Sequence, residues 1–154
     1  MENKWRGLRR DLEEIRLRGE FCLLAGDLNK LVGCNKWGVP GNNPEITLGG
    51  KLLRELLATR DWILVNSLGR EVVEGGPHTR KDPATGVLSC LDLFIVSREL
   101  LPFVKSLVID KERKITPARA VKDKKKYKLI YTDHFSTVIT FEDLPRKQLK
   151  KEET

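Results

Sequence analysis

The sequence predicts a single α/β domain with a mostly antiparallel sheet flanked by helices, and three observations support this. Segments 5–18 and 49–60 carry apolar residues at the three- and four-residue spacing of amphipathic helices. Short apolar runs at Phe21–Gly26 and Trp62–Asn66 follow these segments and are typical of buried strands. The length of 154 residues suits one domain that buries about 70% of the surface its unfolded chain exposes.

The second half of the chain is predicted to be rich in strands. A turn over Lys81–Gly86 separates a short strand near Thr79 from a longer strand over Leu88–Val96. The segments Val104–Ile109 and Phe135–Phe141 alternate with a period of two residues, which predicts two further strands. The order of these elements indicates one layered unit without internal repeats.

Two segments are predicted to lack regular structure. Residues 27–46 have no periodicity and contain several Gly and Pro residues, so we expect a long loop. Structureless connections of this length are uncommon inside compact domains and are often functional. We expect the domain to span residues 1–145 and a charged, disordered tail to cover 146–154. The apolar runs are too short to cross a bilayer and the N-terminus lacks a signal-peptide pattern. These features predict an intracellular protein, nuclear or cytoplasmic.

The formal net charge of +7 is concentrated in one segment. Lys105–Lys128 contains ten basic and three acidic residues, which accounts for the whole excess. Residues 111–128 are predicted to form a loop, because Thr116-Pro117 interrupts the pattern and neighbouring lysines repel one another. Such a segment is either a solvated loop or a binding site for an anionic partner such as nucleic acid. The candidate nucleic-acid-binding residues are Arg119, Lys122, Lys124, Lys125, Lys126 and Lys128.

Polar side chains at three predicted strand ends could carry chemistry. Asp27 and Asn29 follow the first apolar strand and, two residues apart, point to the same side of an extended chain. A carboxylate can orient and deprotonate a water while an amide donates to the charge that develops on phosphoryl oxygens. The pair therefore suits hydrolysis of a phosphate ester. The alternative is that both residues are turn formers.

The other two candidates are Asp92, inside an apolar strand, and the sequence Thr132-Asp133-His134 before the last strand. Histidine can donate to a phosphate or transfer a proton near neutral pH. Adjacent residues of an extended segment face opposite ways, so Asp133 is badly placed to orient its neighbour's ring. Asp92 needs a partner because an unpaired buried carboxylate is costly. We predict that Asp92 orients His134; an edge-strand carboxylate bound to backbone amides is the alternative.

These motifs together resemble a known superfamily. The sequences GDLN, LVNS, SCLDLFIVS and TDH occur in this order, and they resemble the endonuclease/exonuclease/phosphatase superfamily of the exonuclease III and apurinic-endonuclease type. The loop after GDLN and the segments GGKLLRELL and GGPHTRKDP look most like the endonuclease domains of LINE-type (non-LTR) retrotransposons. The resemblance implies a four-layer α/β sandwich, of which this chain would form the C-terminal three-fifths.

The resemblance also implies a Mg²⁺-dependent phosphodiesterase that acts on DNA. Asp27 would align or deprotonate the attacking water, and Asn29 would bind the scissile phosphate and its transition state. Asp92 would orient His134, and His134 would contact a phosphoryl oxygen. Asp133 would lie near the metal.

The chain departs from the family pattern before GDLN. In the family, strands with an asparagine and with the glutamate that is the principal Mg²⁺ ligand precede this motif, but here only 26 residues precede Asp27. Glu13, Glu14 and Glu20 do not stand in the context of that glutamate. We therefore expect little or no nuclease activity from this chain alone. A non-catalytic nucleic-acid-binding module and a protein-interaction module remain open as alternatives.

A partial sandwich would leave one sheet face without a cover. We expect Leu91, Phe94, Val138 and Thr140 to lie on such a face, which would mark an interface. A homodimer in which two copies pack their sheets together would cover it. A separate complementing N-terminal fragment is the competing explanation.

Overall fold

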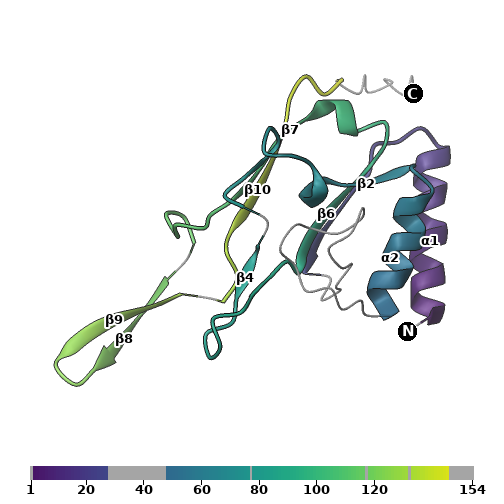
Figure 1. The fold of residues 1–154 in the computed structure, drawn as a ribbon. Coiled ribbons are helices and arrows are strands. Elements are labelled where there is room, and N and C mark those ends of the chain that lie inside the picture. Colours follow the sequence, from purple (N-terminus) through teal and green to yellow (C-terminus); the bar gives the residue numbers. More distant parts are fainter. Residues whose placement is uncertain (1, 28–47, 77, 117, 132, 146–154) are drawn as a thin grey trace, which may run out of the picture.

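The computed structural model describes residues 2–27, 48–76, 78–116, 118–131 and 133–145. As predicted, this part of the chain is a mixed α/β fold in which antiparallel pairing dominates. Two α-helices cover one face of a three-stranded sheet, and a second three-stranded sheet packs on its other face (Figure 1). The Asn29 site and the predicted tail 146–154 lie outside the described residues.

Helix α1 (Glu2–Leu17) begins three residues before the predicted start and presents one apolar side to the interior. Leu12 is buried, and Trp5 and Leu8 pack against the same cluster, as their helical spacing requires. The helix ends where Gly19 adopts a φ of +72° and its N–H bonds to the Arg16 carbonyl at 2.9 Å. Glycine enters this left-handed conformation without steric cost, which makes it the common helix terminator.

Helix α2 (Leu48–Ala58) lies beside α1 and completes the first hydrophobic core (Figure 1). Leu53, Leu56 and Leu57 are at most 1% exposed, so the predicted apolar face of this helix is confirmed. The cluster joins both helices to one face of the first sheet, through Trp62, Leu64, Leu93 and Ile95.

The first sheet has the order β1-β6-β2, with β1 (Leu23–Asp27), β6 (Asp92–Ser97) and β2 (Trp62–Leu64) all antiparallel. Residues of the central strand β6 alternate between two cores. Leu93 and Ile95 face the helices, whereas Phe94 and Val96 face the second sheet. The predicted strand Leu88–Val96 is interrupted, because β5 (Leu88–Ser89) belongs to a separate ladder. The N–H groups of Leu91 and Asp92 instead donate to the side chain of Thr79, which is described below.

The second sheet has the order β10-β7-β3, formed by β10 (Thr137–Phe141), β7 (Val104–Ile109) and β3 (Val73–Glu74). β10 and β7 are the two strands predicted from their alternation, and β3 pairs with β7 in parallel. Gly75 follows β3 with a φ of +93°, and a Cβ at this position would collide with the Ile109 carbonyl. The close approach of these two backbones therefore requires glycine.

The two sheets cover each other's inner faces, which corrects one expectation. Phe94 is only 8% exposed, because the second sheet packs on it. Val138 is 44% exposed and Thr140 is also exposed, because both lie on the outer face of the second sheet. The prediction that Phe94 lies on an uncovered face is therefore wrong.

Two short hairpins extend from this body. The first joins β4 (Arg80–Lys81) to β5 through the predicted turn, in which Asp82 Oδ1 accepts the N–H groups of Ala84 and Thr85 at 2.8 and 3.0 Å.

Between β2 and β3 lies the 3-10 helix η1 (Val65–Ser67), and the 3-10 helix η2 (Leu101–Phe103) precedes β7.

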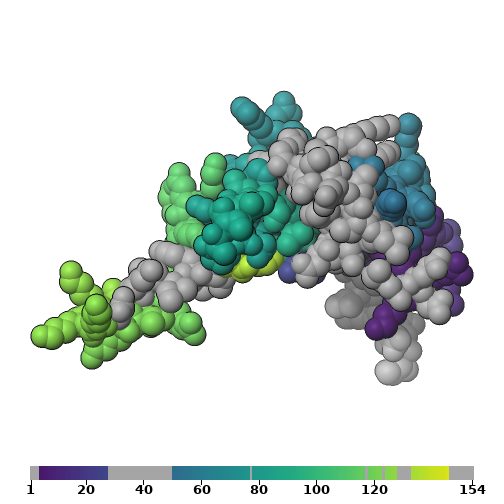
Figure 2. Space-filling model, turned by 60° about the horizontal axis from the view of Figure 1, so that its bottom comes forward, coloured from purple at the N-terminus to yellow at the C-terminus, as the bar shows by residue number. Residues whose placement is uncertain are grey.

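The second hairpin joins β8 (Ala118–Asp123) to β9 (Lys126–Tyr131) and corrects the predicted loop over 111–128. Six register pairs satisfy its backbone, and the turn uses a left-handed residue, Lys124 with a φ of +55°. The lysines that were expected to repel one another are exposed, so water screens them. Figures 1 and 2 show this hairpin projecting away from the body of the molecule.

Among the described residues, neither helix combines the length and the apolar character that crossing a membrane requires. The longer of the two, α1, has 16 residues and many charged side chains.

Candidate active site

Three of the predicted site residues meet at one end of the first sheet. Asp27 is the last residue of β1, and Asp92 is the first residue of β6. The two residues stand directly opposite each other in the antiparallel register, so their side chains leave the same face. His134 lies in the segment before β10, where it forms a β-bridge with Arg80. Residues distant in sequence are thereby brought within reach of one another.

The imidazole of His134 lies between the two carboxylates. His134 Nδ1 is 2.7 Å from Asp92 Oδ2, and His134 Nε2 is 3.7 Å from Asp27 Oδ2. Asp92 is the more buried carboxylate, with 17% of its side chain exposed against 39% for Asp27. The short contact to Asp92 holds the proton on Nδ1, so Nε2 is the ring nitrogen that faces Asp27 and the solvent. The predicted Asp92–His134 contact is present.

Two buried polar side chains fix the backbone that carries Asp92. The Thr79 hydroxyl oxygen accepts the N–H groups of Leu91 and Asp92, each at 3.1 Å. Asn66 donates through Nδ2 to the Asp92 carbonyl at 3.0 Å and accepts the Phe94 N–H through Oδ1 at 2.8 Å. Thr79 and Asn66 are 0% and 2% exposed. These bonds satisfy backbone groups where the chain passes from β5 into β6.

The segment that carries His134 is fixed on both sides of the imidazole. The Phe135 N–H donates to the Thr79 carbonyl at 2.7 Å, so Thr79 contacts the supports of both Asp92 and His134. The Ser136 N–H donates to the Thr116 hydroxyl at 3.1 Å. Thr116 in turn donates its hydroxyl to Asp110. The orientation of the imidazole therefore depends on loops from three parts of the chain.

Asp110 organises the last of these loops. Its carboxylate accepts the Thr116 hydroxyl and the backbone N–H groups of Lys114, Ile115 and Thr116 at 2.6 to 2.9 Å. Burial acts to raise the pKa of Asp110, but the hydrogen bonds from Thr116, Ile115 and Lys114 outweigh it and lower the pKa to about 2. The Arg113 guanidinium lies 4.9 Å from the centre of the Phe135 ring, next to His134.

Asp133, for which the resemblance implies a place near a metal, is engaged elsewhere. Its carboxylate accepts a hydrogen bond from Arg80 Nε at 2.8 Å. This bond lowers the pKa of Asp133 from its usual value. The partner of Asp133 is thus Arg80 and not the ring of His134.

Cys90 lies beneath the site and is not a nucleophile. It is fully buried, and Asn66 Nδ2 lies 3.6 Å from its sulfur. Burial, followed by the charge of Asp92, raises the pKa of the Cys90 thiol to about 12. Only a thiolate attacks effectively, so the group is inert at neutral pH.

The described residues do not fit a dedicated Mg²⁺ site. Asp27, Asp92 and His134 each offer one ligand atom, and these atoms lie within 4.8 Å of one another. Mg²⁺ requires near-octahedral oxygen ligands, whereas this set contains an imidazole. Asp92 Oδ2 is bonded to His134 and Asp133 to Arg80. Mg²⁺ therefore stays a prediction from the resemblance.

Sequence reasoning found Asp27, Asp92 and His134, but it left Asn66 and Thr79 undecided between the cleft and ordinary strand ends. Their signal is weak: each is a single polar residue beside an apolar run. The pairing of Arg80 with Asp133 was missed, because nothing local relates residues 53 positions apart. The predicted basic residues Arg119, Lys122, Lys124, Lys125, Lys126 and Lys128 all belong to the β8–β9 hairpin and its turn.

A comparison of the chain with protein-family models, with curated proteins and with solved structures finds no match. What the chain does therefore has to follow from the contacts of its own residues.

Proposed function

We propose that this chain is a nucleic-acid phosphodiesterase domain in which Asp27, Asp92 and His134 hydrolyse a phosphodiester bond of DNA. The observation that carries the proposal is the imidazole of His134, bonded to Asp92 at Nδ1 and facing Asp27 at Nε2. A histidine oriented by one carboxylate and paired with a second one supplies both an acid and a base.

The two proton transfers of the reaction are divided between Asp27 and His134. Asp27 accepts a proton from the attacking water, whose oxygen forms the new bond to phosphorus. The bond between phosphorus and the leaving oxygen breaks, and His134, which enters this step with a proton on both ring nitrogens, gives that oxygen the Nε2 proton. Asp92 holds the ring and stabilises its protonated form. Nε2 and Asp27 Oδ2 lie 3.7 Å apart, so the proton on Asp27 returns to His134 through one bridging water after product release.

The rate of this reaction is expected to be low. Acid–base catalysis by positioned side chains contributes about 10²- to 10⁴-fold. A metal ion would add several kcal/mol of charge stabilisation, but the described donor set does not match the oxygen ligands of Mg²⁺. We therefore expect slow cleavage by this chain, where the sequence alone predicted little or no activity.

DNA is the proposed substrate because of the β8–β9 hairpin. Arg119, Lys122 and Lys124 to Lys126 are exposed on an element that extends from the body (Figure 1). Its second strand, β9, precedes the segment of His134 in the chain. Clustered cations that contact phosphates gain affinity through counterion release. The hairpin also favours a second candidate function, a non-catalytic DNA-binding module.

A plasmid-nicking assay tests the proposal. The chain should convert supercoiled plasmid slowly to the open circular form, and Asp92→Asn and His134→Gln should each reduce the rate by about 10²-fold or more. Glu13→Gln, an exposed change on α1, serves as the control that should not alter the rate. Parallel reactions with Mg²⁺ and with EDTA show whether a divalent ion is required. Circular dichroism confirms that each variant is folded.

The two candidate functions give different results in this assay. Plasmid binding without any nicking above background identifies the binding module and contradicts the enzyme. Nicking that Asp92→Asn and His134→Gln leave unchanged would mean that this cluster does not catalyse the reaction.

A further inference from the structure

We infer that the hollow between η1 and the end of β3 binds a single nucleotide unit, with its phosphate at Arg70 and its sugar and base against the apolar wall. This inference extends the proposed function, because it adds a site for an unpaired nucleotide that is linked to the candidate active site through Asn66. The inference depends on the proposed function only where it treats the bound nucleotide as part of the substrate. Nucleotide binding itself can be measured without cleavage.

The hollow has the size and lining of a small-ligand site. Its volume is about 510 Å³, within the range of about 300–1,000 Å³ that ligand pockets occupy. Leu68 and Val73 supply apolar surface, and Arg70 supplies one positive charge. The remaining lining residues are Asn66, Gly69, Glu74, Gly75 and Gly76.

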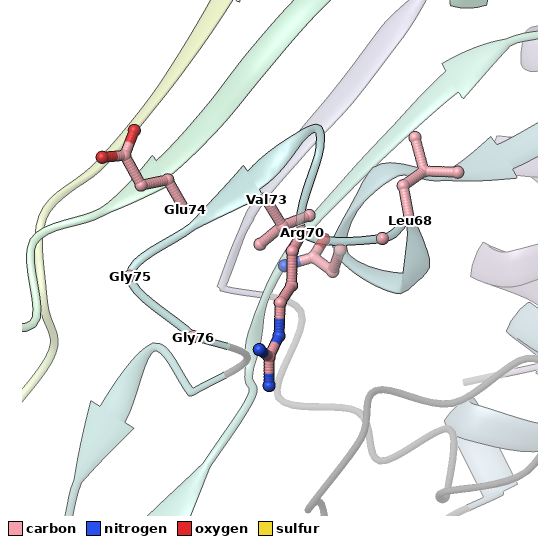
Figure 3. Close-up of a pocket in the computed structure, with 8 residues that line it drawn as sticks. Leu68, Arg70, Val73, Glu74, Gly75 and Gly76 are labelled. Atoms are coloured by element: carbon pink, nitrogen blue, oxygen red, sulfur yellow. The ribbon is translucent and has the colours of Figure 1, made fainter.

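Arg70 is available to an anion. Its side chain is exposed and, among the described residues, no carboxylate lies within ion-pair distance of it. Figure 3 shows Arg70 extended in the direction of Gly76, while the Glu74 carboxylate is turned away from it on the other side of the strand. A guanidinium presents five N–H donors in a planar fork that matches two oxygens of a phosphate.

One wall of the hollow consists of two glycines, and at Gly76 it is open to the close approach of a ligand. Gly75 and Gly76 both have positive φ angles, +93° and +87°, which residues with a side chain adopt only with strain. The Ile109 carbonyl fills the space where a Cβ of Gly75 would lie, whereas a Cβ at Gly76 would meet nothing within 4 Å, so the backbone of Gly76 is accessible to a ligand. Gly75 cannot be replaced without a collision with Ile109, so this wall is fixed by the fold.

Asn66 connects the hollow to the candidate active site. This residue lines the hollow, and its amide also bonds to the Asp92 carbonyl at 3.0 Å. The lining of the hollow therefore includes the residue whose amide holds the backbone of Asp92. An unstacked nucleotide exposes its base faces and edges, which suits a partly apolar hollow better than a stacked duplex does.

The test is an NMR titration of the ¹⁵N-labelled chain with thymidine 5′-monophosphate and, separately, with thymidine. We expect the monophosphate to bind more tightly and to shift the Arg70 Nε–Hε signal and the backbone signals of Gly69 and Gly76. Arg70→Ala should weaken monophosphate binding by about 10-fold or more, the usual loss for a hydrogen bond to a charged group. It should leave thymidine binding nearly unchanged.

A second variant tests the hollow independently of the charge. A Cβ at Gly69 would meet nothing within 4 Å, and the backbone there is not left-handed, so Gly69→Phe adds a bulky side chain to the lining of the hollow without a clash at Cβ. This variant should lose binding of both ligands. Gly69→Ala is its matched small control, and Arg10→Ala on α1 is the matched control for loss of charge.

Each outcome decides the inference. Absence of monophosphate binding at millimolar concentration, equal binding of thymidine, or normal binding by Arg70→Ala or Gly69→Phe would overturn it. Failure of the plasmid-nicking assay together with Arg70-dependent nucleotide binding would instead contradict only the proposed catalysis. Nicking without Arg70-dependent binding would contradict only the hollow.

Discussion

At the scale of single residues, buried polar side chains determine the geometry of the candidate site. Thr79 and Asn66 are almost inaccessible to solvent, yet together they bind four backbone groups of residues 91–94. Buried N–H groups without partners are costly, so this backbone is held in one arrangement. Asp92 therefore meets His134 in a fixed geometry.

Thr79→Val should show how much this fixation contributes. Valine has nearly the same shape but cannot accept the N–H groups of Leu91 and Asp92, so the free energy of unfolding should fall by about 1–3 kcal/mol. Urea denaturation followed by circular dichroism measures the change. Thr79→Ser keeps the hydroxyl and should retain most of the stability; an equal loss in both variants would show that the methyl group is what matters.

Asp110 predicts a pH dependence of stability. Its folded pKa, about 2, lies below the usual value of 3.8. The carboxylate therefore stabilises the fold above pH about 4, and this contribution disappears as the pH falls toward 2. Asp110→Asn should be less stable than the natural chain at pH 6, and the difference should shrink between pH 4 and pH 2. Thermal unfolding of both proteins across this range measures it, and a difference independent of pH would contradict it.

At the scale of elements, the β8–β9 hairpin carries exposed basic side chains that lie outside the two hydrophobic cores. The hairpin residues whose burial the structure describes, 118–122 and 124–127, belong to neither hydrophobic core. Its lysines can therefore be changed with little effect on the fold, unlike the residues of β6.

Removal of hairpin charge should alter the salt dependence of DNA binding. If about five basic residues contact phosphates, the plot of log K against log[salt] should have a slope of roughly −4 to −5. Replacing Lys124, Lys125 and Lys126 by Gln should reduce the magnitude of the slope by roughly 3. Fluorescence anisotropy with a labelled duplex gives both slopes.

A matched triple variant removes equal charge from the two helices and from an exposed end of the second sheet: Lys4→Gln, Lys51→Gln and Lys105→Gln. It should leave the slope nearly unchanged. Equal effects of the two triple variants would mean that the hairpin is not a specific contact surface.

At the scale of the whole molecule, the central strand β6 joins the two cores. Alternate residues of this strand face the helices and the second sheet, and Leu93, Ile95 and Val96 are all inaccessible to solvent. The same strand begins with Asp92. Packing on both faces therefore fixes the position of the Asp92 carboxylate, and the molecule needs both layers to form the candidate site.

The sequence by itself determined most of the helices and strands and three residues of the candidate site. Helical spacing predicted α1 and α2, and two-residue alternation predicted β7 and β10, because these periods depend only on local backbone geometry. The pairing of Asp92 with His134 could be predicted because a carboxylate in an apolar strand needs a partner. The hairpin at 118–131 was not predicted, since mutual repulsion of lysines counts for little once their side chains point into water.

Only the tertiary structure decided how these residues are held and what surrounds them. Thr79 and Asn66 act through bonds to backbone that is distant in sequence, and Asp133 pairs with Arg80 across 53 positions. The hollow at Arg70 likewise exists only where η1 and the end of β3 come together. Such contacts depend on long-range packing, which no local pattern specifies. The sequence names the groups that could react, and the packing of two sheets and two helices sets the distances between them.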